Sequence, residues 1–149
     1  MALVTSKQML LDAQQGGYAV GAFNVENMEM VEAVIAAAEE LNAPVILQTT
    51  PSTVRYASLE LYCANVRAAA GRAQVPVALH LDHGSSFALC AQALRAGYTS
   101  IMIDGSKLPL AQNIALTKQV VDCLLYTSTA PAGALTEHNL RHPQRSKCS

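Results

Sequence analysis

Short apolar runs alternate with longer segments of helical periodicity along most of this chain. Apolar residues recur every three or four positions in residues 28–41, 59–69 and 89–94, a spacing that predicts amphipathic helices. Between these segments lie short continuous apolar runs, which are typical of strands that are covered on both faces of a parallel sheet. The alternation of strand and helix predicts parallel strands joined by right-handed crossovers.

The pattern contains four strand–helix units. Strands are expected at 18–24, 45–47, 77–81 and 100–103, and the last helix is expected to begin at Pro109. Four units are about half of the eight that close a (β/α)₈ barrel. The predicted fold class is therefore α/β, the N-terminal half of a TIM barrel. A doubly wound sheet is the alternative, but it would carry a glycine-rich phosphate loop after its first strand, where residues 24–27 contain no glycine.

Side chains that can cap a helix mark where the helices begin. Thr5 or Ser6 can cap a short first helix, Asn27 can cap the helix after the first strand, and Ser85 or Ser86 the helix after the third. These positions support the division into units that the apolar pattern gives.

The composition changes after Asp122. Residues 123–149 lose the helical period and become rich in Thr, Ser, Ala, Pro and Arg. We therefore expect two parts: a partial barrel over residues 1–122, and an irregular tail over residues 123–149 that is not native to the fold.

Charge and composition exclude several classes of partner. The net charge is −1 and no basic block is present, so the electrostatic footprint of a nucleic-acid-binding protein is missing. No stretch approaches the roughly 20 apolar residues of a membrane span. The four cysteines form no C-x-x-C pair, and at this density we expect a reducing, cytoplasmic environment rather than a disulfide scaffold.

The run Leu79–Gly84 carries the most specific chemistry. Because side chains alternate along a strand, His80 and Asp82 share one face while the leucines share the other. His83 falls at the strand end, where Gly84 lets the chain break away. We interpret Asp82 as an acid/base and His83 as a metal ligand, and an ordinary hydrogen-bonded His–Asp pair is the alternative. His80 is expected to support these two residues or the core.

Polar residues also end the other predicted strands. Working residues of parallel α/β folds gather at the carboxyl ends of the strands, and here Asn24, Thr49, Thr50 and Asp104 hold such positions. Asp104 could support a cation, or it could cap the following turn through its own backbone.

Four segments together resemble a known family. They are Gly17–Asn24, Pro44–Gln48, Leu79–Ser86 and Met102–Ser106. Their order and intervals resemble those of the class II, metal-dependent ketose-bisphosphate aldolases, the fructose- and tagatose-bisphosphate group, over residues 1 to about 122.

The resemblance implies a (β/α)₈ barrel that reversibly cleaves a ketose 1,6-bisphosphate to dihydroxyacetone phosphate and glyceraldehyde 3-phosphate. Asp82 matches the family's proton donor and His83 its first zinc ligand. Asp104 matches an acidic residue associated with a secondary metal position, and Asn24 and Thr50 match positions that face the substrate. The implied cofactor is Zn²⁺, which as a Lewis acid stabilises the enediolate left by carbon–carbon cleavage.

The family's other two zinc histidines, its glutamate base and its phosphate-binding loops lie further along the barrel than the matching residues. We therefore expect a truncated fragment that is inactive alone. One alternative is a non-catalytic half-barrel that functions by associating with another chain, and another is a metal-dependent hydrolase that uses His80, Asp82 and His83. The expected partner is a small sugar bisphosphate, fructose or tagatose, with no nucleic acid and no membrane. Members of the family are usually homo-oligomers.

Overall fold

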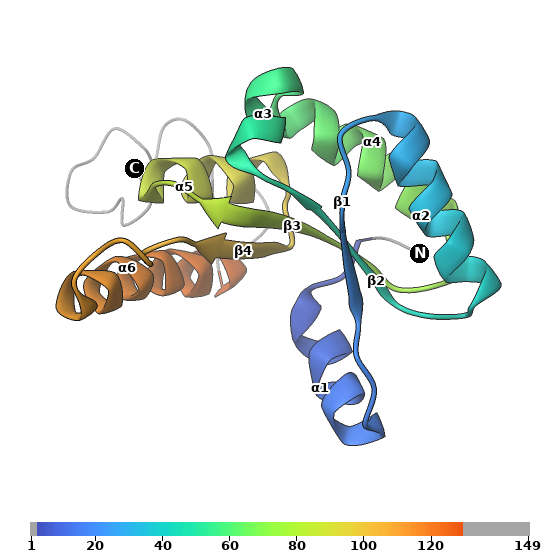
Figure 1. Cartoon of the computed structure of the whole chain (residues 1–149), viewed down its shortest axis with the longest axis horizontal. Helices are drawn as coiled ribbons and strands as arrows, with labels where there is room; N and C mark the ends of the chain where they lie inside the picture. The colour runs from blue at the N-terminus through green and yellow to red at the C-terminus, as the bar shows by residue number, and fades with distance from the viewer. Residues whose placement is uncertain (1–2, 130–149) are drawn as a thin grey trace.

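The computed structural model describes residues 3–129, and the side chains of residues 3–124. Its four strands form one parallel sheet in the order β1-β2-β3-β4 (Figure 1). The strands are β1 (Gly21–Asn24), β2 (Val45–Thr49), β3 (Val77–Gly84) and β4 (Ser100–Ile103). The helices are α1 (Ser6–Gly16), α2 (Met28–Glu40), α3 (Pro51–Ala57), α4 (Leu59–Arg72), α5 (Phe87–Ala96) and α6 (Leu110–Thr129).

Each strand is followed in the chain by at least one helix, and neighbouring helices contact one another along the outer side of the sheet. Strands that are paired in sequence order, with a helical crossover between each pair, are the repeating unit of a (β/α)₈ barrel. The predicted fold class, half of such a barrel, is confirmed.

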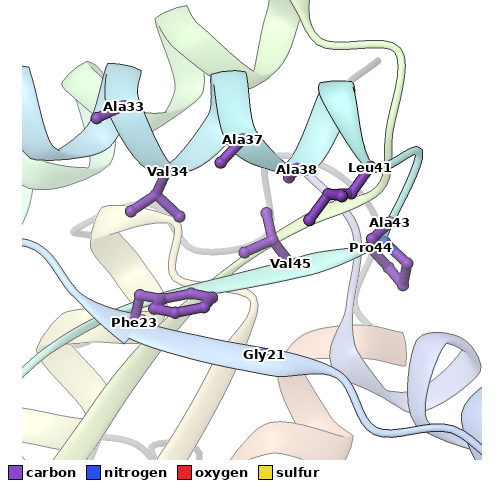
Figure 2. Close-up of a pocket in the computed structure, with 10 residues that line it drawn as sticks. All are labelled: Gly21, Phe23, Ala33, Val34, Ala37, Ala38, Leu41, Ala43, Pro44 and Val45. Carbon is purple, nitrogen blue, oxygen red and sulfur yellow. The ribbon is translucent and has the colours of Figure 1, made fainter.

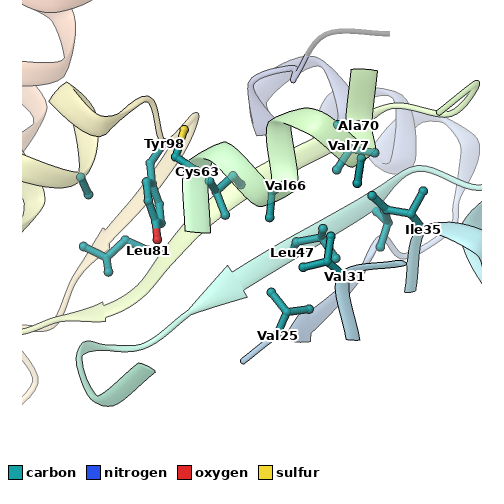
Figure 3. Close-up of a cluster of buried hydrophobic side chains, with 14 of the residues drawn as sticks. Val25, Val31, Ile35, Leu47, Cys63, Val66, Ala70, Val77, Leu81 and Tyr98 are labelled. Carbon is teal, nitrogen blue, oxygen red and sulfur yellow. The ribbon is translucent and has the colours of Figure 1, made fainter. Parts of the chain in front are cut away.

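The hydrophobic core lies between the sheet and these helices (Figure 3). Leu47 and Leu79 are fully buried on the strands, and Val31 and Val66 are fully buried on the helices that cover them. The alternation along β2 explains this arrangement, because Val45, Leu47 and Thr49 are buried while the residues between them are partly exposed. One face of the sheet therefore supplies packing and the other, inner face is left for polar groups.

Strand register brings polar side chains together on the inner face. Asn24 pairs with Gln48, Gln48 with His80, and His80 with Ser100. These four residues form one layer across the whole sheet. Asp82 follows His80 on the same face, one step nearer the carboxyl ends of the strands.

The pairing of β3 with β4 is irregular at the carboxyl end. Leu81 pairs with Ile101 and Gly84 with Ile103, with a register shift between the two pairs. The strand therefore extends to Gly84, beyond the predicted end at residue 81. Asp82 and His83 lie within this shift, which takes them out of the regular ladder.

The segment before α1 is attached to the amino end of the sheet. The Val4 amide donates to the Val77 carbonyl at 2.9 Å, and the Ser6 hydroxyl donates to the Ser100 hydroxyl at 3.1 Å. Thr5 occupies the N-cap position of α1 without a capping hydrogen bond from its side chain. The predicted boundary is confirmed, but the predicted capping role is wrong, because Ser6 is bound to β4 instead.

The other caps form as predicted. The Asn27 side chain accepts from the Met30 amide at 2.9 Å, and the Ser86 hydroxyl accepts from the Leu89 amide at 3.2 Å. These bonds satisfy amide groups that have no partner within the first turn of their helices.

Other elements also differ from the prediction, since β2 ends at Thr49 rather than at residue 47. The first strand begins at Gly21 rather than at residue 18, and a helix that was not predicted, α3, lies between β2 and α4. The last helix continues past Asp122 to Thr129, so residues 123–129 are helical rather than irregular. That residues 123–149 are foreign to the fold stays a prediction, and residues 130–149 lie outside the described part of the chain.

Within residues 3–129, none of the helices combines the length and apolar character that a membrane span requires.

Candidate functional site

Asp82 is held on the inner face by the side chain of Gln48. The Gln48 amide nitrogen donates to Asp82 Oδ2 at 2.9 Å and to Asn24 Oδ1 at 2.7 Å. One side chain of β2 thus links the carboxyl ends of β1 and β3. The Asp82 side chain is 17% exposed, so its carboxylate is partly shielded and still reachable from the open inner face.

His83 lies beside Asp82 and bonds to Asp104. Its Nδ1 atom is 2.9 Å from Asp104 Oδ2, and its Nε2 atom is 3.9 Å from Asp82 Oδ1. Its side chain is 59% exposed. The structure therefore brings together the three residues that the sequence singles out as acid/base, metal ligand and secondary acidic residue.

The two charged partners shift each other's titration. The hydrogen bond with Asp104, with the Asp82 charge, raises the pKa of His83 above its ordinary value of 6.5. Hydrogen bonds from Ser106 and from His83 lower the pKa of Asp104. Both groups are consequently charged in the weakly acidic range, and each holds the other in place.

Asp104 also caps the turn that follows it. Its Oδ1 atom accepts from the Ser106 amide at 3.0 Å, while Oδ2 bonds to His83. The two roles that the sequence leaves open, turn capping and support of a neighbour, are therefore performed by different oxygens of one carboxylate.

The backbone at the end of β3 is shaped by two residues rather than by glycine alone. His83 adopts φ 51°, a left-handed conformation that is uncommon for residues other than glycine, although histidine is among those that adopt it more often. Gly84 is needed for close approach, because a Cβ atom there would lie 2.7 Å from both Cys90 Sγ and the Met102 carbonyl oxygen. The positive φ turns the imidazole out of the strand alternation and toward Asp104.

His80 bonds away from this group. Its Nδ1 atom is 2.8 Å from the Ser100 hydroxyl. Burial lowers the pKa of His80, and the Asp82 charge opposes that shift. The role of His80 stays a prediction, and this geometry joins its Nδ1 atom to Ser100 rather than to Asp82 or His83.

Thr50 lies at the end of β2, but its hydroxyl acts on α3. It accepts from the Thr53 amide at 3.4 Å and lies 2.7 Å from the Ser52 hydroxyl. Asn24 is bound to Gln48, as described above. Both residues are at the carboxyl end of the sheet, where the resemblance implies contact with a substrate.

Two residues that hydrogen-bond to these side chains were not predicted from the sequence. Gln48 bridges Asn24 and Asp82, and Ser100 partners His80. The sequence does contain an indication of them, because both are polar residues at inner-face positions of otherwise apolar strands. Only the register between strands shows which side chains they meet.

The fit to zinc is partial. Among residues 3–124, no three His, Cys, Asp or Glu side chains converge in a way that could hold a metal ion, whereas a catalytic zinc takes about three protein ligands. His83 is the candidate for one of them, because Asp104 engages Nδ1 and Nε2 is the nitrogen that would remain to hold a metal, as in carboxylate–histidine pairs at metal sites. The described residues therefore supply one oriented imidazole and no complete site.

An apolar pocket lies elsewhere, between β1 and α2 on the helix side of the sheet (Figure 2). Phe23 and Val45 face Val34, Ala37 and Leu41 across it. It contains no titratable side chain, so it lacks the groups that recognise a phosphorylated sugar. Because β1 is the edge strand, the pocket lies at the edge of the sheet.

Comparison with known proteins gives consistent results. The sequence model of the family described as "Fructose-bisphosphate aldolase class-II" matches residues 4–130. A curated fructose-bisphosphate aldolase of Staphylococcus aureus strain Mu50 is 46% identical over 127 residues, covering 82% of this chain and 44% of the relative. The chain therefore spans less than half the length of this relative.

Solved aldolase structures are also similar over most of this chain and about half or less of their own length. The YdjI aldolase of Escherichia coli K12 is similar with a TM-score of 0.80 and 36% identity, over 85% of this chain and 49% of that one. A putative fructose-1,6-biphosphate aldolase from Coccidioides immitis gives 0.76 and 31%, over 81% and 42% of the two chains.

Proposed function

Because this chain belongs to the class II fructose-bisphosphate aldolase family, we propose that it carries the proton-transferring half of an aldolase site. The reaction is the reversible cleavage of a ketose 1,6-bisphosphate, fructose or tagatose, to dihydroxyacetone phosphate and glyceraldehyde 3-phosphate. The observation that carries the proposal is the placement of Asp82: hydrogen-bonded to Gln48, 3.9 Å from His83 Nε2, and facing the open inner side of the sheet.

Asp82 performs the acid/base step. In cleavage, its carboxylate accepts the proton of the hydroxyl on the carbon beyond the breaking bond. As that carbon becomes an aldehyde, the electron pair of the carbon–carbon bond moves toward the neighbouring carbonyl and gives an enediolate. In condensation, the same carboxyl returns the proton to the new hydroxyl. Gln48 supports this step by fixing the orientation of the carboxylate.

Zn²⁺ is the proposed cofactor, with His83 as one ligand through Nε2 and Asp104 as the group that orients the imidazole. Among residues 3–124, His83 is the one histidine that we assign to this role, and no three possible ligands converge there, whereas a catalytic zinc takes about three protein ligands. We accordingly propose that the 149-residue chain has no retro-aldol activity by itself. A cytoplasmic location follows from the proposed substrate class, because sugar bisphosphates are too highly charged to cross a membrane unaided.

A chimera tests the proposal. Residues 4–130 are joined to the remaining part of the Staphylococcus aureus relative, and cleavage of both sugar bisphosphates is assayed with and without a chelator. We expect activity that the chelator abolishes and Zn²⁺ restores. Asp82→Asn should lower kcat by about 10²–10⁴-fold, whereas Asp12→Asn, on α1, should leave it unchanged. A folded chimera without activity, or one indifferent to Asp82→Asn, contradicts the proposal.

A second candidate function is association with another chain without catalysis. It is favoured by β1, all four residues of which are exposed, and by the apolar pocket beside that strand. This candidate predicts a stable oligomer of the 149-residue chain in which β1 is covered, and no activity in the chimera.

A further inference from the structure

Ser6, Ser100 and His80 form a chain of hydrogen bonds that the aldolase chemistry described above does not use. The Ser6 hydroxyl donates to the Ser100 hydroxyl at 3.1 Å, and the Ser100 hydroxyl lies 2.8 Å from His80 Nδ1. The three residues come from α1, β4 and β3, and 94 residues separate the two serines in the chain.

We propose that Ser6 and Ser100 are positioning residues that hold His80 as the neutral tautomer with its hydrogen on Nε2, directed to the inner face beside Asp82. The part of this inference that concerns Asp82 rests on the proposed function. The tautomer itself follows from the hydrogen bonds alone.

The hydrogens decide the tautomer. Ser100 has one hydroxyl hydrogen and, since it accepts from Ser6, that hydrogen is free to be donated. His80 Nδ1 is the acceptor within reach, so Nδ1 carries no hydrogen. The opposite tautomer would make the Ser100 hydroxyl accept from both sides and leave its own hydrogen without an acceptor among the side chains of residues 3–124.

The location of His80 agrees with a neutral ring. It is paired in register with Gln48 and Ser100 in the polar layer, and burial disfavours its charged form. His80 and His83 therefore differ, although they are three positions apart: the first is a neutral donor, and the second favours the charged form beside Asp104.

The consequence concerns the surroundings of Asp82. A neutral Nε2–H adds a hydrogen-bond donor to the inner face without adding positive charge next to the acid/base carboxylate. The donor can serve an oxygen of water or of a bound polyol. The hydrogen bonds that begin at Ser6 of α1 thus reach His80, which lies in the polar layer next to Asp82.

Nitrogen spectroscopy of the full 149-residue chain tests the inference. Two-bond ¹H–¹⁵N correlation spectra distinguish Nδ1–H from Nε2–H for each histidine ring, and His80→Phe assigns the signals. We expect His80 to be wholly Nε2–H at neutral pH. An Nδ1–H or a doubly protonated ring would overturn the proposal.

Variants test the two serines. Ser100→Ala should convert His80 to a mixture of tautomers, Ser6→Ala should do so to a smaller extent, and Ser100→Thr, which keeps the hydroxyl, should restore the single tautomer. Ser85 is an exposed serine directly after β3. Ser85→Ala is therefore the matched control and should leave the His80 spectrum unchanged. An unchanged His80 spectrum in Ser100→Ala refutes the inference. The aldolase proposal is tested separately, by the activity of the chimera and of its Asp82→Asn variant. If that proposal fails, the expected tautomer of His80 is unaffected.

Discussion

At the scale of single residues, the site depends on backbone shape as much as on side chains. His83 can reach Asp104 because its φ of 51° turns the ring out of the strand. Gly84 then allows β3 to lie close against Cys90 and the Met102 carbonyl. A short stretch of β3 thus sets the position of the imidazole.

Gly84→Ala should therefore destabilise the fold. The added Cβ would lie 2.7 Å from the Met102 carbonyl oxygen, and because this neighbour is backbone it cannot move without bending β4. We expect the free energy of unfolding, measured with urea, to fall by about 1–3 kcal/mol. Gly71→Ala, where nothing lies within 4 Å of the new atom, is the control and should lose no stability.

The ion pair between His83 and Asp104 should depend on pH in a defined direction. The raised pKa of His83 contributes stability that is fully present below 6.5 and is lost as pH rises through the folded-state value. The lowered pKa of Asp104 contributes stability present above its ordinary 3.8, which is lost as pH falls through the folded-state value.

Removing the Asp104 carboxylate tests the direction of this pH dependence. Asp104→Asn should lower the urea midpoint more at pH 5.5 than at pH 8.5, and it should bring the His83 pKa, followed by NMR, back toward 6.5. An equal loss of stability at both pH values would show that turn capping at Ser106, rather than the ion pair, is the main contribution of Asp104.

Which side chains lie together in the candidate site could largely be predicted at this scale, and their roles stay predictions. The alternation in Leu79–Gly84 was enough to indicate Asp82 and His83, and the strand end indicated Asp104. The partners could not be predicted, because Gln48 and Ser100 meet Asp82 and His80 only through the register of neighbouring strands. Nor does the sequence show that His83 rather than Gly84 adopts the positive φ.

At the scale of elements, helix caps fix where the crossovers begin. The Asn27 side chain receives the Met30 amide at the start of α2. This helix covers the edge of the sheet and places Val31 and Ile35 in the core. The turn after β1 is thereby joined to the packing of the helix.

Asn27→Ala should cost about 1 kcal/mol of stability, because the Met30 amide loses its acceptor. Urea unfolding followed by circular dichroism measures the change. Asn27→Ser retains a capping oxygen and should recover most of the loss. If both variants were equally destabilised, packing at this position rather than capping would be responsible.

The order and direction of the strands were predictable, since they follow from the period of the apolar positions. The short helix α3 was not, because Pro51 and the polar residues around it are also typical of a loop. Its cap at Thr50 explains why it forms. The extension of α6 beyond Asp122 shows that a change in composition need not coincide with a helix end.

At the scale of the whole molecule, a four-stranded sheet leaves its first strand open. Phe23 is 50% exposed and Leu41, at the end of α2, is 74% exposed, and both line the apolar pocket. Exposed strand edges with apolar flanks favour association. We expect the isolated 149-residue chain to form larger species as its concentration rises.

A charged substitution at the pocket tests this expectation. Phe23→Glu should shift the chain toward monomer in light scattering, because the carboxylate opposes burial of this surface. Tyr56→Glu, on α3 and 79% exposed, changes an aromatic residue outside the pocket and should have no such effect. Equal association of both variants and the parent chain would place the contact elsewhere.

The bond between Ser6 and Ser100 also bears on how the chain folds during synthesis. Its two ends are 94 residues apart, so α1 leaves the ribosome well before β4 and cannot make this contact until β4 has emerged. Through that interval Ser6 lacks its partner on β4, and the Val4–Val77 bond is the described link that can already hold this segment to the sheet. A nascent chain arrested before residue 100 should accordingly be cleaved by a protease within residues 6–16 more readily than a chain that includes β4.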